Sequence, residues 1–185
     1  MVELRIPDAD LLPDYESALN RGWSPTPVAP EVTRQRHLAA IAQDRAAFLA
    51  SLDDRAARGA PVILPDGSTV PRLPGFSRWV WHGGFCGVVN MRWQPGTADL
   101  PAHVLGHVGY GIVPWRRREG IATSALGLLL AAIAPIGLPF VELTTDPAND
   151  ASIRVITANG GVLVERFTKV AAHGGGEALR WRITL

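Results

Sequence analysis

Residues 109–122 read GYGIVPWRRREGIA, a stretch in which a strand pattern passes into a helix pattern. The segment from Val108 to Val113 is apolar enough for a buried strand, which Pro114 ends. Ile121 opens the helical pattern. Its apolar positions recur at Ala125, Leu128, Leu129, Ala132 and Ile133. The sequence therefore predicts a strand, a turn and a helix in direct succession.

The turn between this strand and this helix has the features of an anion site. Arg116, Arg117 and Arg118 follow one another, and Gly120 precedes the helix. The first amides of a helix have no partner within it and lie at the positive end of its dipole. Because Gly120 has no side chain, a phosphate can approach those amides. The turn suits a pyrophosphate, although surface arginines at such a junction also occur without a ligand.

Two other phosphate-binding patterns are excluded. The lysine-containing GxxxxGK[ST] sequence is absent, which argues against that class of nucleotide triphosphatase. The three-glycine dinucleotide fingerprint, with an acidic residue about 20 positions later, is also missing.

Length and composition indicate one globular domain over residues 1–185. That length allows a single substantial core, and 47% hydrophobic against 19% charged residues argues against disorder. A net charge of +1 gives no global basic field, so we expect no nucleic-acid partner.

A cytoplasmic location is expected from the cysteine content and the first residues. Cys86 is the only cysteine, so an internal disulfide is impossible and a reducing compartment fits. The opening MVELRIPDADLLPDY lacks a basic region followed by an apolar run. The uncharged stretch 121–141 has the length of a membrane span, but Pro135, Gly137 and Pro139 interrupt it. We therefore expect a helix, a turn and a core strand, and no membrane partner.

The remaining pattern predicts helices alternating with strands. Helices are expected at 11–19, 31–52, 121–136 and from Asp146–Pro147 to Asn159–Gly161; strands are expected at 3–6, 77–81, 85–93, 108–113 and 139–145, with a short extended piece at 62–64. Two further strands flank a loop with Gly174, Gly175 and Gly176. In the last strand, Leu179, Trp181, Ile183 and Leu185 alternate with Arg180, Arg182 and Thr184.

The 109–122 stretch and the helix expected after Asp146 resemble the GNAT superfamily of N-acetyltransferases, and more closely a bacterial branch of predicted acetyltransferases. The family's pyrophosphate loop, [QR]xxGx[GA], is matched by Arg117, Gly120 and Ala122. Its preceding hydrophobic-x-Pro element is matched by Ile112, Val113 and Pro114. A second signature, an asparagine followed three residues later by a small residue, is matched by Asn149 and Ser152 on the helix expected from Asp146.

The resemblance implies an α/β (mixed α+β) fold. Its central mixed sheet has six to seven strands, is splayed between two parallel strands, and carries helices on both faces. The splayed strands would be 108–113 and 140–145, with the pantetheine arm of acetyl-CoA in the gap. The residues that would bind acetyl-CoA by this resemblance are Tyr110, Gly111, Ile112, Val113, Arg117, Arg118, Glu119, Gly120, Ile121, Ala122, Thr123, Asn149 and Ser152.

The chain departs from the family at two catalytic positions. Many members carry a tyrosine seven residues after the asparagine, as an acid toward the leaving thiolate; here that residue is Ile156. Some carry a glutamate five residues before the asparagine as a base; here it is Thr144. The remaining catalytic candidates are Tyr110 and His107, with Glu142 as a third. His107 also fits a hydrogen-bonded core residue, and Glu142 a structural ion pair.

Arg92 is the candidate for acceptor binding. It either binds an acidic group of the acceptor or pairs with a surface carboxylate. No metal site is expected, because no cysteine or carboxylate completes a set with His103 and His107. Cys86 is expected to be a packing residue.

The resemblance implies an acyltransferase that uses acetyl-CoA and no metal to acetylate a primary amine of a small molecule or peptide. An acetyl-CoA-binding or CoA-binding module without turnover remains the alternative, as does a structural α/β protein with a fortuitous loop. The acceptor pocket is expected to include the N-terminal helices and the loops 59–75 and 94–102. The C-terminal hairpin offers a contact for a homodimer.

Overall fold

A long antiparallel hairpin, β5 (Gly75–Trp81) and β6 (Phe85–Arg92), lies at the centre of the computed structural model, which describes residues 1–63, 67–170 and 175–185. β1 (Glu3–Arg5) and β7 (Val108–Ile112) extend this hairpin into a sheet of order β1-β5-β6-β7, and β2 (Asp53–Asp54) also pairs with β5. The hairpin predicted from the sequence is confirmed.

A second sheet has the order β8-β10-β9, from β8 (Phe140–Thr145), β10 (Glu177–Thr184) and β9 (Val162–Thr168). Every pairing recorded between described strands is antiparallel. β3 (Val62–Ile63) and β4 (Thr69–Val70) form a separate small hairpin. It confirms the extended piece expected at 62–64 except for Leu64, which lies outside the described residues, as does Gly174 of the last loop.

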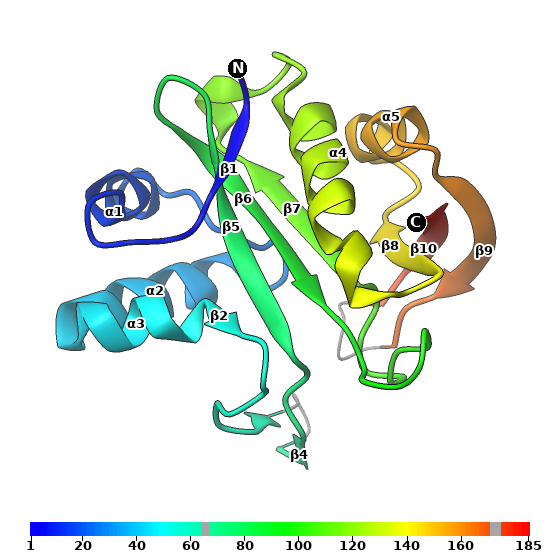
Figure 1. Ribbon diagram of the computed structural model, residues 1–185, viewed down its shortest axis with the longest axis horizontal. Coiled ribbons are helices and arrows are strands. Elements are labelled where there is room, and N and C mark those ends of the chain that lie inside the picture. Colours follow the sequence, from blue (N-terminus) through cyan, green and yellow to red (C-terminus); the bar gives the residue numbers. More distant parts are fainter. Residues whose placement is uncertain (64–66, 171–174) are drawn as a thin grey trace.

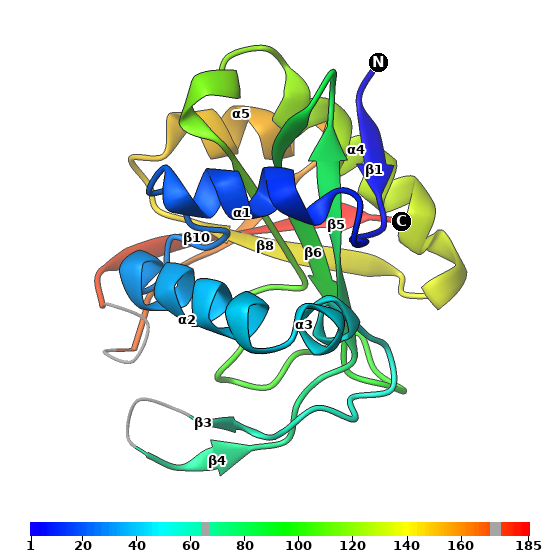
Figure 2. The same cartoon turned by 90° about the vertical axis from the view of Figure 1, so that its left-hand side faces the viewer.

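Helices cover both faces of the sheets, as the mixed α/β prediction requires. α1 (Leu12–Asn20), α2 (Pro30–Gln43) and α3 (Arg45–Ser51) lie on one side, and α4 (Ile121–Ile133) and α5 (Asp150–Ala158) on the other (Figure 1). Figure 2 shows α1 and α2 in front of β5 and β6. Each side has its own apolar core: Tyr15, Trp79 and Phe85 in one, and Leu126, Leu129 and Leu143 in the other.

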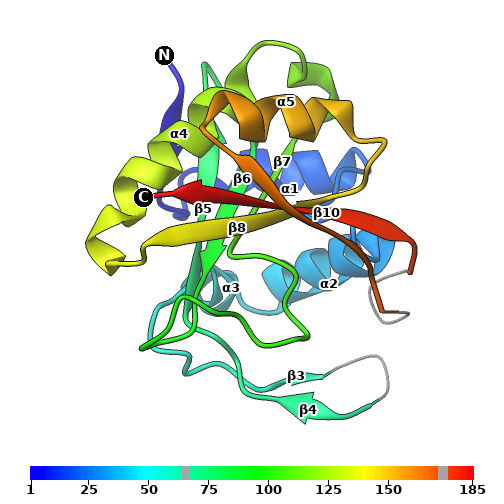
Figure 3. The ribbon, with the colours of Figure 1, turned by 90° about the vertical axis from the view of Figure 1, so that its right-hand side faces the viewer.

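The two sheets separate between β7 and β8, where no strand ladder is recorded. They are joined beside the start of β7, where the His107 amide donates to the Glu142 carbonyl at 2.8 Å. Figure 3 shows β8 and β10 running across the direction of β5 and β6, so the strands diverge from this joint. The division predicted between 108–113 and 140–145 is confirmed.

Two predicted helices have different bounds. The helix expected over 31–52 is broken at Asp44, whose extended backbone (φ −157°) ends α2 and whose carboxylate accepts a hydrogen bond from the Ala47 amide at 2.9 Å. This side-chain cap starts α3 afresh. The helix expected from Asp146 begins at Asp150, because Asn149 provides the cap and the Asn149 amide closes a turn on the Asp146 carbonyl.

The helix after the arginine turn is shorter than the apolar stretch suggested. α4 ends at Ile133 and a short 3-10 turn (Ala134–Ile136) follows. Within the described ranges, no helix has both the length and the apolar character needed to cross a membrane. Leu128, assigned to the buried face, is 42% exposed, and Leu126 is buried instead. In β10, Leu179, Trp181 and Ile183 are buried as predicted, while Leu185 at the chain end is exposed.

Candidate active site

A cavity of about 1300 Å³ opens where β7 and β8 separate. Its wall combines the connector between α1 and α2 (residues 21–29, the α1–α2 connector), β6, β7, the arginine turn, the end of β8 and the first turns of α5. The residues used below are Trp23, Pro25, Asn90, Arg92, Gly109, Tyr110, Gly111, Ile112, Arg117, Arg118, Gly120, Thr144, Asp146, Asn149, Ser152, Arg154, Ile156 and Lys169. The connector was not predicted to contribute; the loops 59–75 and 94–102, which were, do not line it in the described part of the chain.

A row of unpaired backbone amides lies at one end of the cavity. The Arg117 amide donates to the Pro114 carbonyl, and the first helical bond of α4 runs from the Ser124 amide to Gly120. Between them, the amides of residues 118–123 have no acceptor among the described residues. Gly120 has φ +73°, the left-handed conformation that favours glycine and turns the chain into α4. Unpaired amides at a helix start are the arrangement that favours an anion.

The three consecutive arginines have different partners. Arg116 binds Glu119, with Nε and Oε1 3.1 Å apart, and donates to the His82 carbonyl; this pairing lowers the pKa of Glu119. Arg117 Nε donates to the Ile112 carbonyl at 3.1 Å. For Arg118, and for Arg154 on α5, no side-chain partner is recorded among the described residues. Both line the cavity, so both are available to phosphates. Arg154 matched no motif in the sequence.

Alternation along β7 decides which backbone groups face the gap. Gly111 pairs with Val88 in the ladder with β6, and the Val113 amide donates to the Cys86 carbonyl at 2.9 Å. The Val113 carbonyl accepts from Arg116, so both backbone groups of Val113 are used. The groups of Tyr110 and Ile112 point the other way, into the gap. Four strand residues were predicted to contact pantetheine. The prediction is wrong for Val113, which is fully buried and has no free backbone group. Gly111 contributes only surface, because its backbone groups face β6.

The start of α5 faces β7 across the cavity. Asn149 Oδ1 accepts the Ser152 amide at 3.1 Å, so Asn149 is the helix cap as well as a cavity residue. The phenol of Tyr110 donates to the Ser152 carbonyl at 3.3 Å. Burial raises the pKa of Tyr110, an effect that the Ser152 contact opposes, and the phenol stays protonated at neutral pH. Ile156, one helical turn after Ser152, is buried against the cavity.

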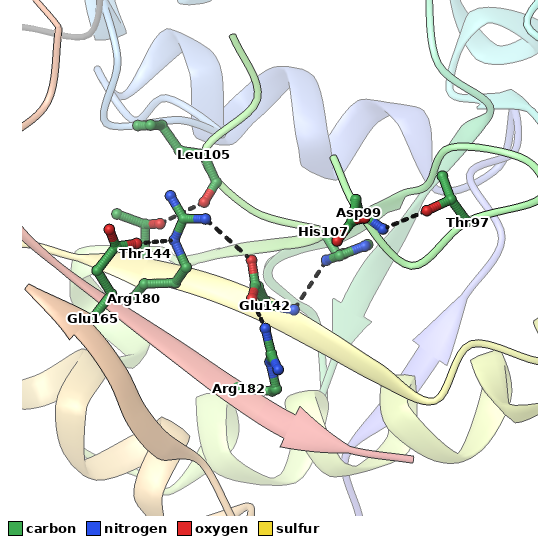
Figure 4. Close-up of polar contacts among 9 residues, drawn as sticks. All are labelled: Thr97, Asp99, Leu105, His107, Glu142, Thr144, Glu165, Arg180 and Arg182. Atoms are coloured by element: carbon green, nitrogen blue, oxygen red, sulfur yellow. Dashed lines mark hydrogen bonds and ion pairs between the residues drawn. The ribbon is translucent and has the colours of Figure 1, made fainter. Parts of the chain in front are cut away.

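His107 lies in the joint between the sheets and does not line the cavity. Its ring is fully buried; Nδ1 accepts the Glu142 amide at 3.0 Å, and Nε2 has no partner among the described residues (Figure 4). Burial lowers its pKa, an effect that nearby Glu142 partly opposes. The position fits the core alternative considered for this histidine.

Glu142 and Thr144 are held by structural contacts in the same region. The Glu142 carboxylate lies 2.7 Å from Arg182 and 3.5 Å from Arg180 (Figure 4). The Thr144 hydroxyl donates to the Leu105 carbonyl. Glu142 therefore takes the structural alternative, an ion pair, and is not a candidate base.

Arg92 lies at the other end of β7 from the unpaired amides. Its guanidinium donates to the Gly106 carbonyl at 3.1 Å and to Asn90 Oδ1 at 2.6 Å, and burial lowers its pKa. The surface ion pair considered for Arg92 is not recorded among the described residues. Asp146 and Lys169, which the sequence did not single out, pair at 2.6 Å on the cavity wall.

A metal or a reactive thiol finds no support in the described part of the chain. No group of three or more possible metal ligands occurs there. Cys86 is buried, its thiol lies 3.3 Å from the Gly84 carbonyl, and burial raises its pKa.

Comparison with known proteins gives a family and a fold. Residues 30–162 match the family model described as acetyltransferase (GNAT) domain. No curated protein sequence matches the chain significantly.

Solved structures resemble the chain over nearly its whole length. RimJ from Mycobacterium smegmatis, solved with a CoA disulfide, is 18% identical, with a TM-score of 0.68 over 99% of this chain and 81% of its own. RimL, a ribosomal L7/L12 alpha-N-protein acetyltransferase solved with coenzyme A, is 13% identical, with a TM-score of 0.66 over 100% and 94%. The microcin C7 self-immunity acetyltransferase MccE, solved with acetyl-CoA and AMP, is 11% identical, with a TM-score of 0.63 over 100% and 92%.

These structures share the fold, and the family model covers most of the chain, including the strand, the arginine turn and the helix cap that form the cavity. The chain belongs to the GNAT family of acetyltransferases.

Proposed function

We propose that the protein transfers the acetyl group of acetyl-CoA to a primary amine of a small molecule or peptide by direct attack. The observation that carries this proposal is the row of unpaired amides at residues 118–123, at the head of the gap between β7 and β8. A diphosphate is a suitable acceptor for several amides in a row at a helix start.

The coenzyme is proposed to lie along the gap. Amides from Arg118 to Thr123 hold the diphosphate, with the Arg118 and Arg154 side chains beside it. The backbone groups of Tyr110 and Ile112 bind the pantetheine arm, and Asn149 contacts it from the cap of α5. To reach Ile112 fully, the coenzyme displaces the Arg117 side chain, which occupies that carbonyl in this structure.

Tyr110 is proposed as the proton donor to the leaving thiolate. The neutral amine nitrogen forms a bond to the thioester carbonyl carbon, the C–S bond breaks, and the nitrogen loses its surplus proton to water. The sulfur takes the phenolic proton, which solvent then replaces. Two facts support this role: the Tyr110 hydroxyl reaches the first turn of α5, one turn from Ile156, and burial keeps the phenol protonated.

Amine deprotonation is proposed to use water and no dedicated protein base. Asp146 is the one carboxylate in the described lining, and it is already paired with Lys169. His107 is buried outside the cavity wall, so we assign it no catalytic step. The rate should therefore rise with pH as the acceptor amine loses its proton, without a further inflection from a protein group between pH 5 and 8.

A module that binds the coenzyme without turnover is the second candidate, because Ile156 replaces the usual tyrosine. Calorimetric titration with acetyl-CoA, combined with thiol release over a panel of amines, separates the two. Tight binding with amine-dependent release supports the enzyme. Tight binding with release at the rate of buffer alone favours the module, and no binding contradicts both.

We keep a cytoplasmic location and a homodimer as further proposals. The buried free thiol of Cys86 is compatible with a reducing compartment. β9 is the outer strand of its sheet, and Val162, Leu163 and Val164 are exposed on it, which leaves an edge that a second copy can pair with. Light scattering of the protein and of Val164→Lys tests the dimer: a monomeric wild type refutes it.

A further inference from the structure

Arg92 is a cation in the cavity wall without a carboxylate partner among the described residues. Other partly buried cations of the chain have one: Arg78 lies 2.9 Å from Asp53, and Lys169 2.6 Å from Asp146. Arg92 has two neutral partners, the Gly106 carbonyl and Asn90 Oδ1. A guanidinium has five N–H donors, so donors remain for a ligand that enters the cavity.

The distance along β7 separates Arg92 from the proposed phosphate site. The Arg92 amide pairs with the His107 carbonyl beside the first residue of β7, whereas the unpaired amides follow its last residue, Ile112. Five residues of extended chain span about 17 Å. Arg92 is therefore too far from the proposed diphosphate site to contact a phosphate. Its charge is available to a ligand at the opposite end of β7.

Two residues of β7 between Arg92 and the α1–α2 connector are glycines, and both have close neighbours. Gly109 pairs with Asn90 and Gly111 with Val88, on the face that carries the Asn90 and Arg92 side chains. A Cβ on Gly109 would lie 3.0 Å from Asn90 Oδ1. A Cβ on Gly111 would lie 3.7 Å from the Pro25 carbonyl and 3.8 Å from the Trp23 ring. The two glycines thus allow the Asn90 side chain and the connector to lie close to β7, and all of these residues line the cavity together with Arg92.

We propose that the acceptor is an amine that also carries a carboxylate, which Arg92 binds with Asn90 beside it in the cavity. This inference rests on the proposed function and specifies its substrate class. Arg–carboxylate pairing in a partly buried site is strong and directional, because two parallel N–H donors meet two oxygens. The amine then extends along β7 toward the thioester.

The test compares amines that differ only in the carboxylate. Calorimetry on the CoA-saturated protein uses amino acids of several chain lengths against their carboxamides, and amidated Ser-Glu-Ala against amidated Ser-Gln-Ala. In at least one pair, the carboxylate member is expected to bind about 10- to 100-fold more tightly, as the loss of a charged hydrogen bond implies. A preference within the amino-acid pairs identifies a free amino acid as the source of the carboxylate. A preference within the peptide pair identifies a peptide side chain.

Three variants then locate the preference. Arg92→Gln should reduce the discrimination to below about threefold, and Arg92→Lys should restore part of it. Arg78→Gln, in the neighbouring strand, should leave it unchanged. Affinity for CoA, measured separately, should stay within about twofold in all three, which separates this proposal from the coenzyme site.

Two results would overturn the proposal. One is equal affinity within every pair, or no carboxylate binding at all, for the CoA-saturated wild type. The other is full discrimination retained in Arg92→Gln. If Arg92→Gln does not fold, the wild-type comparison still decides. Loss of CoA binding itself would instead contradict the proposed function.

Discussion

The Tyr110 phenol donates a hydrogen bond to the Ser152 carbonyl at 3.3 Å and thereby connects β7 to the first turn of α5 across the cavity. The two residues come from the two elements that would enclose the pantetheine arm. The contact also brings the phenol within one helical turn of Ile156, where the family's usual acid is missing. In the proposed function, Tyr110 on the strand provides the hydroxyl that the resemblance assigns to the helix.

Replacing Tyr110 by phenylalanine removes this hydroxyl and keeps the ring. If the phenol protonates the thiolate, kcat should fall about 100-fold, in the range of general acid catalysis, with little change in the KM for acetyl-CoA. Steady-state thiol release measures both constants. Tyr15→Phe is the matched control, because Tyr15 is the other tyrosine and lies in the opposite core. Equal kcat in wild type and Tyr110→Phe would remove Tyr110 from the mechanism.

Gly120 tests the site proposed for the diphosphate. Its φ of +73° disfavours other residues, and no atom lies within 4 Å of a Cβ built there, so a valine side chain would extend into the cavity. Gly120→Val should weaken acetyl-CoA binding at least tenfold by calorimetry, because the side chain keeps phosphate from the amides of residues 118–123.

Gly137→Val controls for the backbone strain. Gly137 has φ +80° and equally open space around its Cβ, but it lies beyond the other end of α4 and outside the cavity lining. Both variants should lose about 1–2 kcal/mol of folding stability, while only Gly120→Val should lose affinity. Equal affinity in the two variants would place the diphosphate elsewhere.

The elements that the sequence predicted well are those with local signals. The hairpin β5–β6, the strand β7 and the arginine turn carry periodic apolar residues and glycines within short stretches, and they lie where expected. The break at Asp44 was missed because helix formers such as Ala40, Ala46 and Ala47 flank it. A capping carboxylate in such a run resembles any exposed polar residue.

The contribution of the α1–α2 connector to the cavity was missed because it depends on tertiary contacts. The α1–α2 connector is rich in proline and carries no motif, and its place beside Gly111 in the cavity wall comes from the folded chain. Strand pairing similarly determines that Val113 has no free backbone group, because its amide donates to Cys86 and its carbonyl accepts from Arg116. Successive residues of a strand direct their backbone groups to opposite edges. With the partner strand known, this alternation would have reduced the four residues predicted to contact pantetheine to two.

Asn149 is the cap of α5 and, in the proposed function, also a coenzyme contact, and substitutions can separate the two. Asn149→Ala removes the cap on the Ser152 amide and should cost about 1 kcal/mol of stability. Asn149→Asp keeps the accepting oxygen, so the urea midpoint should stay near wild type, but its charge faces the proposed path of the coenzyme. Its affinity for acetyl-CoA should fall about tenfold. Asp44→Asn, the reverse exchange at the cap of α3, should leave that affinity unchanged. Unaltered affinity in Asn149→Asp would make Asn149 a cap alone.

The stability of the α1–α3 side should depend on pH through His37. Its Nδ1 lies 2.7 Å from the Tyr15 hydroxyl, and burial, aided by the charge of Arg36, lowers its pKa to about 4. Above pH 6.5 the ring is neutral in both folded and unfolded chains, so it has no effect there. Between pH 6.5 and 4 only the unfolded chain gains the proton, so stability is lost as pH falls.

His37→Gln removes the titrating group and keeps an oxygen that can accept the Tyr15 hydroxyl. The loss of unfolding free energy between pH 7 and pH 4.5, measured by urea denaturation, should be smaller in the variant by up to about 2.5 kcal/mol, because pH 4.5 stops short of the folded pKa of about 4. His107, whose pKa burial also lowers, contributes equally to both proteins and cancels in the comparison. If the two proteins lose stability in parallel as the pH falls, His37 accepts its proton as readily in the folded chain as in the unfolded one.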